Sequence, residues 1–403
     1  MPVKFTELNL NEDILEAISY MGYEEATPVQ EKAIPDILDN KDMIACAQTG
    51  TGKTAAFILP ILNKIGGKEI KGVNTLIIVP TRELAIQIDQ QIQGLAYFVP
   101  VNSIALYGGT DGSDWDQQKI ALTTGTHIVV ATPGKLMAHL DMGYVNFSEL
   151  EHLILDEADR MLDMGFVDDI TKIIKYLPEN RQTLMFSATM PPKIRTLTKT
   201  ILKNPVELNF GLAKPAEGVL QAAYLCFEPG KKDLVAYLIK DKPDYKSILI
   251  FCARKKMVAE LARSLKKVDK NVEGISSDLE QSQREEVLLG FRSKKTRILV
   301  ATDVMSRGID VKDIDLVINF DVPDDAEDYV HRVGRTARAK GTGVALSIVS
   351  PDDMEKLARI EHLIESEVYK IPVPKEIGES PTWNPDGGRK YKKKKFSGGK
   401  KRF

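Results

Sequence analysis

Short apolar runs alternate with longer amphipathic stretches along most of this chain. The runs have the length and the Val, Ile and Leu content of buried strands, while the stretches between them repeat their apolar positions about every 3.6 residues, as helices do. This alternation predicts an α/β fold in which a parallel sheet carries helices on both faces. In the first half the expected strands are Met43–Cys46, Thr75–Val79, Ser103–Tyr107, His127–Ala131, His152–Leu155, Thr183–Phe186 and Val206–Phe210.

The same alternation starts again in the second half of the chain. Between the two regions, Asn209 to Val219 contains Gly, Pro and Ala without periodicity, which favours a linker over 209–219. The pattern therefore predicts one α/β domain over residues 1–208 and another over 220–370. In the second domain the expected strands are Ser247–Phe251, Arg297–Ala301, Leu316–Asn319 and Val344–Val349.

Composition is typical of a globular protein, with 43% hydrophobic and 28% charged residues among 403. No apolar run approaches the ~20 residues of a membrane-spanning helix, and the N-terminus lacks the apolar segment of a secretory signal. Cys46, Cys226 and Cys252 have no CxxC spacing and lie in apolar runs, so we expect reduced core residues. These features predict a cytoplasmic protein with no membrane partner.

The net charge of −2 conceals a basic C-terminus. Residues 387–403 contain nine Lys and Arg and no acid, whereas the rest of the chain has 46 basic against 57 acidic residues, a net charge of −11. We expect residues 371–403 to form a disordered basic tail, because this segment loses its apolar periodicity. Two interpretations remain open: a solubilising end, or an arm that binds phosphates while Tyr391 and Phe396 stack on bases.

A glycine-rich loop, 47–54, lies between an expected strand and an expected helix. Glycines let backbone N–H groups turn toward a phosphate, Lys53 can reach the β/γ oxygens, and the Thr54 hydroxyl can hold Mg²⁺. The generic loop pattern has Gly where this chain has Ala47. About a hundred residues later, Asp-Glu-Ala-Asp at 156–159 follows an expected buried strand. Together the two motifs predict a nucleoside triphosphate site with a metal.

The loop sequence Ala-x-Thr-Gly-x-Gly-Lys-Thr and the Asp-Glu-Ala-Asp motif resemble those of the DEAD-box ATP-dependent RNA helicases. The resemblance extends from Phe5 to about Ile364, and the compact core with only a short basic tail looks most like the bacterial RhlE-type subgroup. It implies two RecA-like lobes in tandem, an ATP-binding lobe with an N-terminal Q motif and a helicase C-terminal lobe, with ATP and Mg²⁺ as cofactors. The ATP-binding residues that it implies are Phe5, Tyr23, Gln30, Ala47, Gln48, Thr49, Gly50, Thr51, Gly52, Lys53, Thr54 and Asp310.

Chemical roles follow from the same resemblance. It implies that Thr54 and Asp156 hold Mg²⁺ and that Glu157 positions and deprotonates the attacking water. Arg335 and Arg338 are three residues apart, so a helix would place them on one face, as suits two arginine fingers. The implied catalytic residues are Lys53, Asp156, Glu157, Arg335 and Arg338, and the residues implied to couple hydrolysis to strand separation are Asp159, Ser187, Thr189 and His331.

Three motifs, beginning at residues 80, 108 and 132, directly follow expected strands. They therefore lie at the carboxyl ends of the strands, where open α/β sheets bind ligands. Their Gly and Thr residues permit close approach to, and hydrogen bonds with, nucleic-acid phosphates. The chain departs from the family at Lys135, where arginine is usual, and at Ser276-Ser277, where His-Gly is common. The RNA-binding residues that the resemblance implies are Pro80, Thr81, Arg82, Gly108, Gly109, Thr132, Pro133, Gly134, Gln281, Arg284, Thr302 and Gly308.

RNA is therefore the expected partner, single-stranded or as a short duplex and contacted mainly through its backbone. Ribosomal or decay machinery are candidate further partners. Two other functions stay open: a DNA-directed helicase of the same superfamily, and an ATP-gated RNA clamp without multiple turnover. The Gln30 context and the Asp159 motif disfavour the first, and an intact Glu157 disfavours the second.

Overall fold

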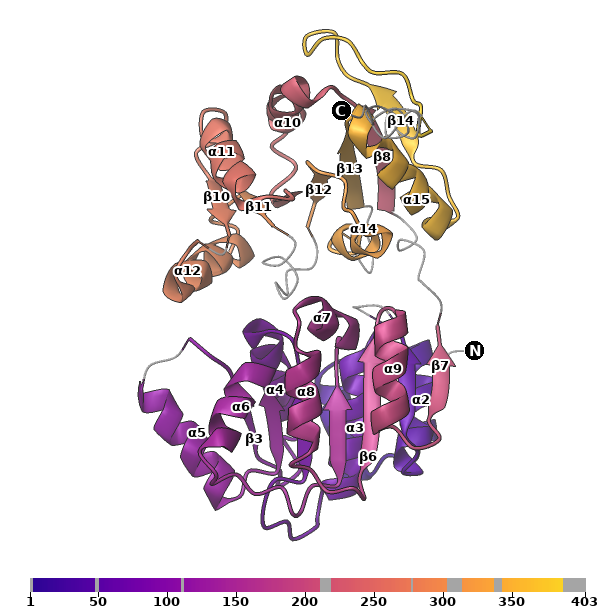
Figure 1. Cartoon of the computed structure of the whole chain (residues 1–403), viewed down its shortest axis with the longest axis vertical. Coiled ribbons are helices and arrows are strands. Elements are labelled where there is room, and N and C mark those ends of the chain that lie inside the picture. Colours follow the sequence, from indigo (N-terminus) through magenta and orange to yellow (C-terminus); the bar gives the residue numbers. More distant parts are fainter. Residues whose placement is uncertain are drawn as a thin grey trace, which may run out of the picture. The chain divides into compact units, whose positions relative to one another are not determined.

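The computed structural model describes residues 3–47, 51–109, 112–210, 219–276, 278–302, 314–336 and 343–386. The chain divides into two compact units, residues 1–212 and 213–403, each built on its own sheet (Figure 1). Most of the expected linker 209–219, and the basic segment 387–403, lie outside the described residues.

The first unit contains a parallel seven-stranded sheet in the order β3-β4-β2-β5-β6-β1-β7. Successive side chains point to opposite faces of a strand. Leu76 and Ile78 accordingly belong to one core cluster and Ile77 and Val79 to the other, so each face of the sheet has its own core. The strands are β1 Met43–Cys46, β2 Thr75–Ile78, β3 Ser103–Leu106, β4 Ile128–Ala131, β5 His152–Leu155, β6 Gln182–Ser187 and β7 Val206–Asn209.

Helices cover both faces of this sheet, as the alternation of patterns predicted (Figure 1). A short 3-10 turn, Phe5–Glu7, precedes the first of them. The helices of the first unit are α1 Glu12–Tyr20, α2 Pro28–Leu38, α3 Lys53–Ile65, α4 Arg82–Leu95, α5 Gly112–Thr124, α6 Pro133–Asp141, α7 Ala158–Asp163, α8 Val167–Ile174 and α9 Pro192–Ile201.

The second unit contains a second parallel sheet in the order β10-β11-β9-β12-β13-β8-β14. The predicted α/β class, with two parallel sheets in tandem, is confirmed. Its strands are β8 Val219–Leu225, β9 Ile248–Phe251, β10 Val272–Ile275, β11 Ile298–Ala301, β12 Leu316–Asn319, β13 Gly343–Val349 and β14 Tyr369–Pro372; its described helices are α10 Lys231–Ile239, α11 Lys255–Leu265, α12 Gln281–Arg292, α14 Ala326–Val333 and α15 Met354–Ile364.

The predicted start of the disordered tail at residue 371 is wrong. β14 pairs with β8 as far as Pro372, and Val373 is buried. The Lys370 ammonium lies 4.7 Å from the ring centroid of Trp383, and the Asn384 N–H donates to Met354 Sδ. These few apolar anchors hold residues 371–386 against the second unit although the segment has no strand or helix periodicity. Within the described ranges, no helix combines the length and apolar character that crossing a membrane would require.

Candidate active site

The phosphate loop joins β1 to α3. Ala47 continues β1 by donating its N–H to the Ser187 carbonyl at 2.9 Å. Gly52 has a φ of +89°, and Lys53 is the first residue of α3 and is 5% exposed. A glycine at this φ places a lysine at the start of a helix, where backbone N–H groups favour anions. The loop residues Gln48, Thr49 and Gly50 lie outside the described residues.

Gln30 contacts the phosphate loop directly. Its Oε1 accepts the Thr27 N–H at 2.8 Å, and its Nε2 donates to the Gly52 carbonyl at 3.1 Å. A Cβ on Gly52 would lie 2.5 Å from Gln30 Nε2, so this contact also requires glycine at 52. The Phe5 and Tyr23 rings stack on each other with centroids 6.4 Å apart. Of these three expected ATP-binding residues, Gln30 thus lies directly against the loop.

Asp156 and Glu157 follow β5, two strands away from β1 in the sheet. Asp156 is 3% exposed, and its Oδ1 accepts the Glu157 N–H at 2.9 Å. Burial raises the pKa of Asp156 to about 6; the Lys53 charge opposes this rise, and the Glu157 charge adds to it. An added cation would favour the charged carboxylate, because opposite charges lower a carboxyl pKa.

Glu157 has two features that the sequence analysis missed. Its φ is +51°, a left-handed conformation that is uncommon for a residue other than glycine. Its Oε2 forms a 2.9 Å ion pair with the Arg160 guanidinium, and both side chains are largely buried. The signal available in the sequence was the i,i+3 spacing of opposite charges at the start of a helix. The ion pair orients the Glu157 carboxylate.

Asp159 joins this motif to the end of β6. Its Oδ2 accepts the N–H groups of Ala188 at 3.1 Å and Thr189 at 2.8 Å. The Asp159 N–H donates to Ser187 Oγ at 3.1 Å. Hydrogen bonds from N–H groups to a carboxylate are among the stronger ones in proteins. The ends of β5 and β6 are therefore held together by the residues that the sequence assigned to coupling.

The three loops expected to bind RNA follow β2, β3 and β4. These strands are adjacent and parallel, so their carboxyl ends lie along one edge of the sheet. Arg82 donates to the Gly109 carbonyl at 3.2 Å, which ties two of the loops together. A Cβ added to Gly108 or Gly134 would meet no atom of the described residues within 4 Å beyond the adjoining chain, so both positions leave room for a ligand. Pro80 and Thr81 precede Arg82 after β2, and Thr132 and Pro133 precede Gly134 after β4.

Lys135 follows these loops on the first turn of α6. Its ammonium lies 4.4 Å from the ring centroid of Trp115 in α5. The Trp115 ring in turn stacks on the buried His139, with centroids 4.0 Å apart and an interplanar angle of 14°. A cation–π contact restricts a lysine that otherwise lacks the fixed geometry of arginine.

The second unit contributes fewer described site residues. Thr302 directly follows β11, Arg284 Nε donates to the Leu279 carbonyl at 2.9 Å, and Gln281 begins α12. Gly308, Asp310 and Arg338 lie outside the described residues.

The prediction that a helix carries both Arg335 and Arg338 is wrong. α14 ends at Val333, and Arg335 lies in the turn that follows. The Arg335 carbonyl accepts the Ile314 N–H at 3.2 Å, and Thr336 Oγ1 donates to the Ile314 carbonyl, so the chain is drawn back toward the start of β12. Within α14, His331 Nδ1 lies 4.0 Å from Asp328 Oδ1.

Comparison with known proteins identifies the same two regions. Residues 27–197 match the model of the DEAD/DEAH box helicase family, and residues 230–340 match that of the helicase conserved C-terminal domain. The ATP-dependent RNA helicase CshA of Listeria monocytogenes is 42% identical over 383 residues, covering 94% of this chain and 71% of the relative. The CshA helicase of Geobacillus kaustophilus is 40% identical and covers 92% and 78%.

Solved structures give the same result. Saccharomyces cerevisiae Dbp5 bound to RNA and ADP BeF3 matches with a TM-score of 0.82 and 28% identity, covering 97% of this chain and 98% of that one. Mss116p bound to ssRNA and AMP-PNP matches with a TM-score of 0.82 and 29% identity, covering 94% and 81%. The expected RhlE-type subgroup is not supported, because the similar helicases are named CshA.

Proposed function

The chain belongs to the DEAD-box family of ATP-dependent RNA helicases, and from this membership we propose how its residues divide the reaction. It hydrolyses ATP in a reaction that RNA stimulates. Lys53 and the loop before α3 bind the phosphates, Glu157 accepts a proton from the attacking water, and Arg335 and Arg338 stabilise the transferring phosphoryl group. Phosphoryl transfer of this kind depends on positioning and charge stabilisation more than on covalent chemistry.

The junction between Asp159 and residues 187–189 carries the proposal. One carboxylate binds two N–H groups beyond β6 and lies in the same short segment as Asp156 and Glu157. A movement of the segment after β5 would thereby reach the end of β6 directly, through the hydrogen bonds of the Asp159 carboxylate. Coupling of hydrolysis to local separation of short RNA duplexes would use this connection.

The described residues fit a Mg²⁺ ion that arrives with ATP. Among them no group of three or more His, Cys, Asp and Glu side chains forms a metal cage, while Asp156 supplies one nearly buried carboxylate. Mg²⁺ is typically held by one or two carboxylates together with substrate phosphates and water. Thr54 and Asp156 would hold it, and the ion would neutralise charge on the phosphate oxygens. The residues' own tasks are to bind ATP and to accept the water proton.

Glu157→Gln tests the role of Glu157. The amide cannot accept a proton, whereas Asp156, Lys53 and the RNA-facing loops are unchanged, so ATP and RNA binding should persist while turnover stops. We expect phosphate release to fall by ~10²–10⁴-fold, the usual contribution of a general base. Asp163→Asn, at the end of the same helix α7, serves as the control. Undiminished phosphate release by Glu157→Gln would exclude Glu157 as the base.

The same assay separates the other two functions. Multiple-turnover phosphate release stimulated by RNA supports the helicase, stimulation by DNA alone supports a DNA-directed enzyme, and a single turnover followed by a stable RNA complex supports an ATP-gated clamp. A cytoplasmic location and ribosomal or decay partners belong to this proposal as well. Crosslinking in cells followed by RNA sequencing would identify the RNA targets.

A further inference from the structure

The two sheets have the same strand order, so each strand of one unit has an equivalent strand in the other. β8 occupies the position of β1, β12 that of β5, and β13 that of β6. The segment equivalent to the phosphate loop is therefore 226–230, after β8. β8 was not among the strands expected from the sequence, so this segment had not been recognised as the counterpart of the phosphate loop. In the segment after β8, the second unit retains one element of a phosphate site.

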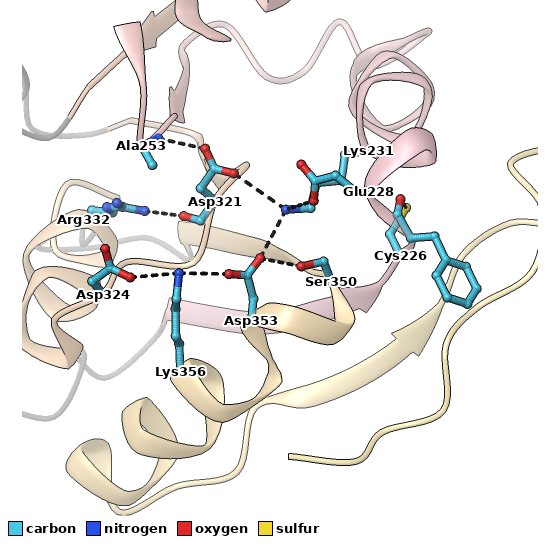
Figure 2. A network of polar contacts seen from close by, with 11 residues as sticks. Cys226, Glu228, Lys231, Ala253, Asp321, Asp324, Arg332, Ser350, Asp353 and Lys356 are labelled. Carbon is cyan, nitrogen blue, oxygen red and sulfur yellow. Dashed lines mark hydrogen bonds and ion pairs between the residues drawn. The ribbon is translucent and has the colours of Figure 1, made fainter. Parts of the chain in front are cut away.

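That element is a lysine. Gly230 and Lys231 stand where the first unit has Gly52 and Lys53, and each lysine is the first residue of the helix that follows. Lys231 is 1% exposed. Its ammonium lies 2.9 Å from Glu228 Oε2, 3.2 Å from Asp353 Oδ2 and 3.6 Å from Asp321 Oδ1 (Figure 2). Carboxylates of the chain itself thus surround this lysine, where a phosphate would lie in a nucleotide site.

These carboxylates come from the equivalent strand ends. Asp321 follows β12, much as Asp156 follows β5, and Asp353 follows β13. Asp353 also accepts from Ser350 Oγ at 2.8 Å and pairs with Lys356 at 3.0 Å. Burial alone would lower the pKa of Lys231, but the charges of Asp353, Asp321 and Glu228 outweigh it and raise that pKa. The cluster is therefore a charged, internally paired structure.

Asp321 connects this cluster to α14. Its Oδ2 accepts the Ala253 N–H at 2.8 Å, and its backbone carbonyl accepts from Arg332 at 2.8 Å (Figure 2). Arg332 is 3% exposed, donates also to Asn319 Oδ1 at 3.1 Å, and lies over the Phe251 ring at 4.9 Å. It lies in the last turn of α14, three residues before Arg335.

We propose that Lys231 is a positioning residue for ATP hydrolysis. Its ion pairs fix Asp321 at the end of β12, Asp321 anchors Arg332, and this anchor sets the end of α14 and the turn that carries Arg335. The lysine that binds phosphate in the first unit thus binds carboxylates in the second, where it orients a phosphate-binding arginine. This inference rests on the proposed action of Arg335 on the phosphoryl group.

Lys231→Met tests it, with Lys232→Met as the matched control. Lys232 is the next residue of the chain and has a half-exposed ion pair with Glu260 at 2.8 Å. With RNA saturating, and well below the melting temperature, we expect Lys231→Met to lower kcat by about ten- to a hundredfold, because small misplacements cost this much. KM for ATP should change little, since the loss concerns the transition state. The control should retain its kcat.

A double-mutant cycle distinguishes a positioning role of Lys231 from a purely structural one. If Lys231 acts through Arg335, Lys231→Met should cause no further loss of kcat in an Arg335→Ala protein. The same loss in both backgrounds would overturn the inference. Asp321→Asn provides a second variant if Lys231→Met does not fold. It keeps acceptor atoms for Ala253 and Arg332, replaces the oxygen that pairs with Lys231 by an uncharged NH2 group, and should show the same dependence on Arg335.

Failure of the inference can be told from failure of the proposed function. A large loss of kcat in Arg335→Ala together with normal kcat in both Lys231→Met and Asp321→Asn overturns the positioning role alone. A normal kcat in Arg335→Ala removes the proposed role of Arg335, and the positioning role with it.

Discussion

At the residue scale, side chains of the site are held by neighbours before any ligand is bound. The Gln30 amide bonds Thr27 and Gly52, and the Glu157 carboxylate pairs with Arg160. An amide has two N–H donors and two acceptor lone pairs, so Gln30 retains one of each for a base. Its bond to Gly52 links the nucleotide's base side to its phosphate side through a single side chain.

Gln30→Ala should weaken ATP binding and reduce the preference for ATP over GTP. Guanine presents an acceptor at O6 where adenine presents an amine, so an amide that binds the adenine edge discriminates between them. The ratio of kcat/KM for ATP and GTP measures this effect, with the exposed Gln93→Ala as the control. Because Gln30 also bonds Gly52, equal losses for both nucleotides would indicate support of the loop alone. Equal use of ATP and GTP by the unmodified protein would contradict base reading.

At the scale of elements, period and apolar content predicted all seven strands of the first unit and missed three strands of the second. Met43–Cys46 was predicted with its observed bounds because three of its four residues are buried and apolar. β8 was missed because only two of its residues are buried, β10 contains Gly274, and β14 is a partly exposed edge strand ending in Pro372. The ion pair between Glu157 and Arg160 was not predicted either, because it depends on the left-handed backbone conformation of Glu157, which hydrophobic periodicity does not reveal.

Polar contacts across elements were also beyond the sequence, because their members are far apart in the chain. At the start of β5, His152 bonds Gln182 Oε1 of β6 at 3.1 Å, and Lys64 of α3 donates to the same oxygen at 3.0 Å. Burial, together with the nearby Lys64 charge, lowers the pKa of His152 to about 4. Burial likewise lowers the pKa of Lys64 to about 8.

His152 should therefore lower the stability of the first unit in mild acid. The ordinary pKa of histidine is about 6.5, so the unfolded chain binds the His152 proton more tightly than the folded chain. Stability from the neutral ring is complete above that pH and is lost as the pH falls toward about 4. His152→Gln should flatten the change of melting temperature between those values, whereas His362→Gln, at an exposed site, should not. An unchanged slope in His152→Gln would contradict the assignment.

At the scale of the whole molecule, charge is divided unevenly along the chain. Residues 387–403 carry nine positive charges, and the remainder has a net charge of −11. All residues assigned to chemistry lie at or before Arg338. The basic segment can therefore alter RNA affinity without altering the chemical step, which makes its two interpretations separable by experiment.

Removal of residues 387–403 should weaken RNA binding, most strongly at low salt. Each phosphate neutralised on a single strand contributes a slope of about −0.7 to the dependence of log affinity on log salt, through release of counterions. Truncation should flatten that slope and raise the RNA concentration for half-maximal ATPase stimulation, while maximal turnover changes little. A protein whose tail has the same composition in scrambled order should behave like the unmodified chain, since the effect depends on charge. Tyr391→Ser with Phe396→Ser then measures the part due to stacking. If truncation left both affinity and slope unchanged, residues 387–403 would be a solubilising end.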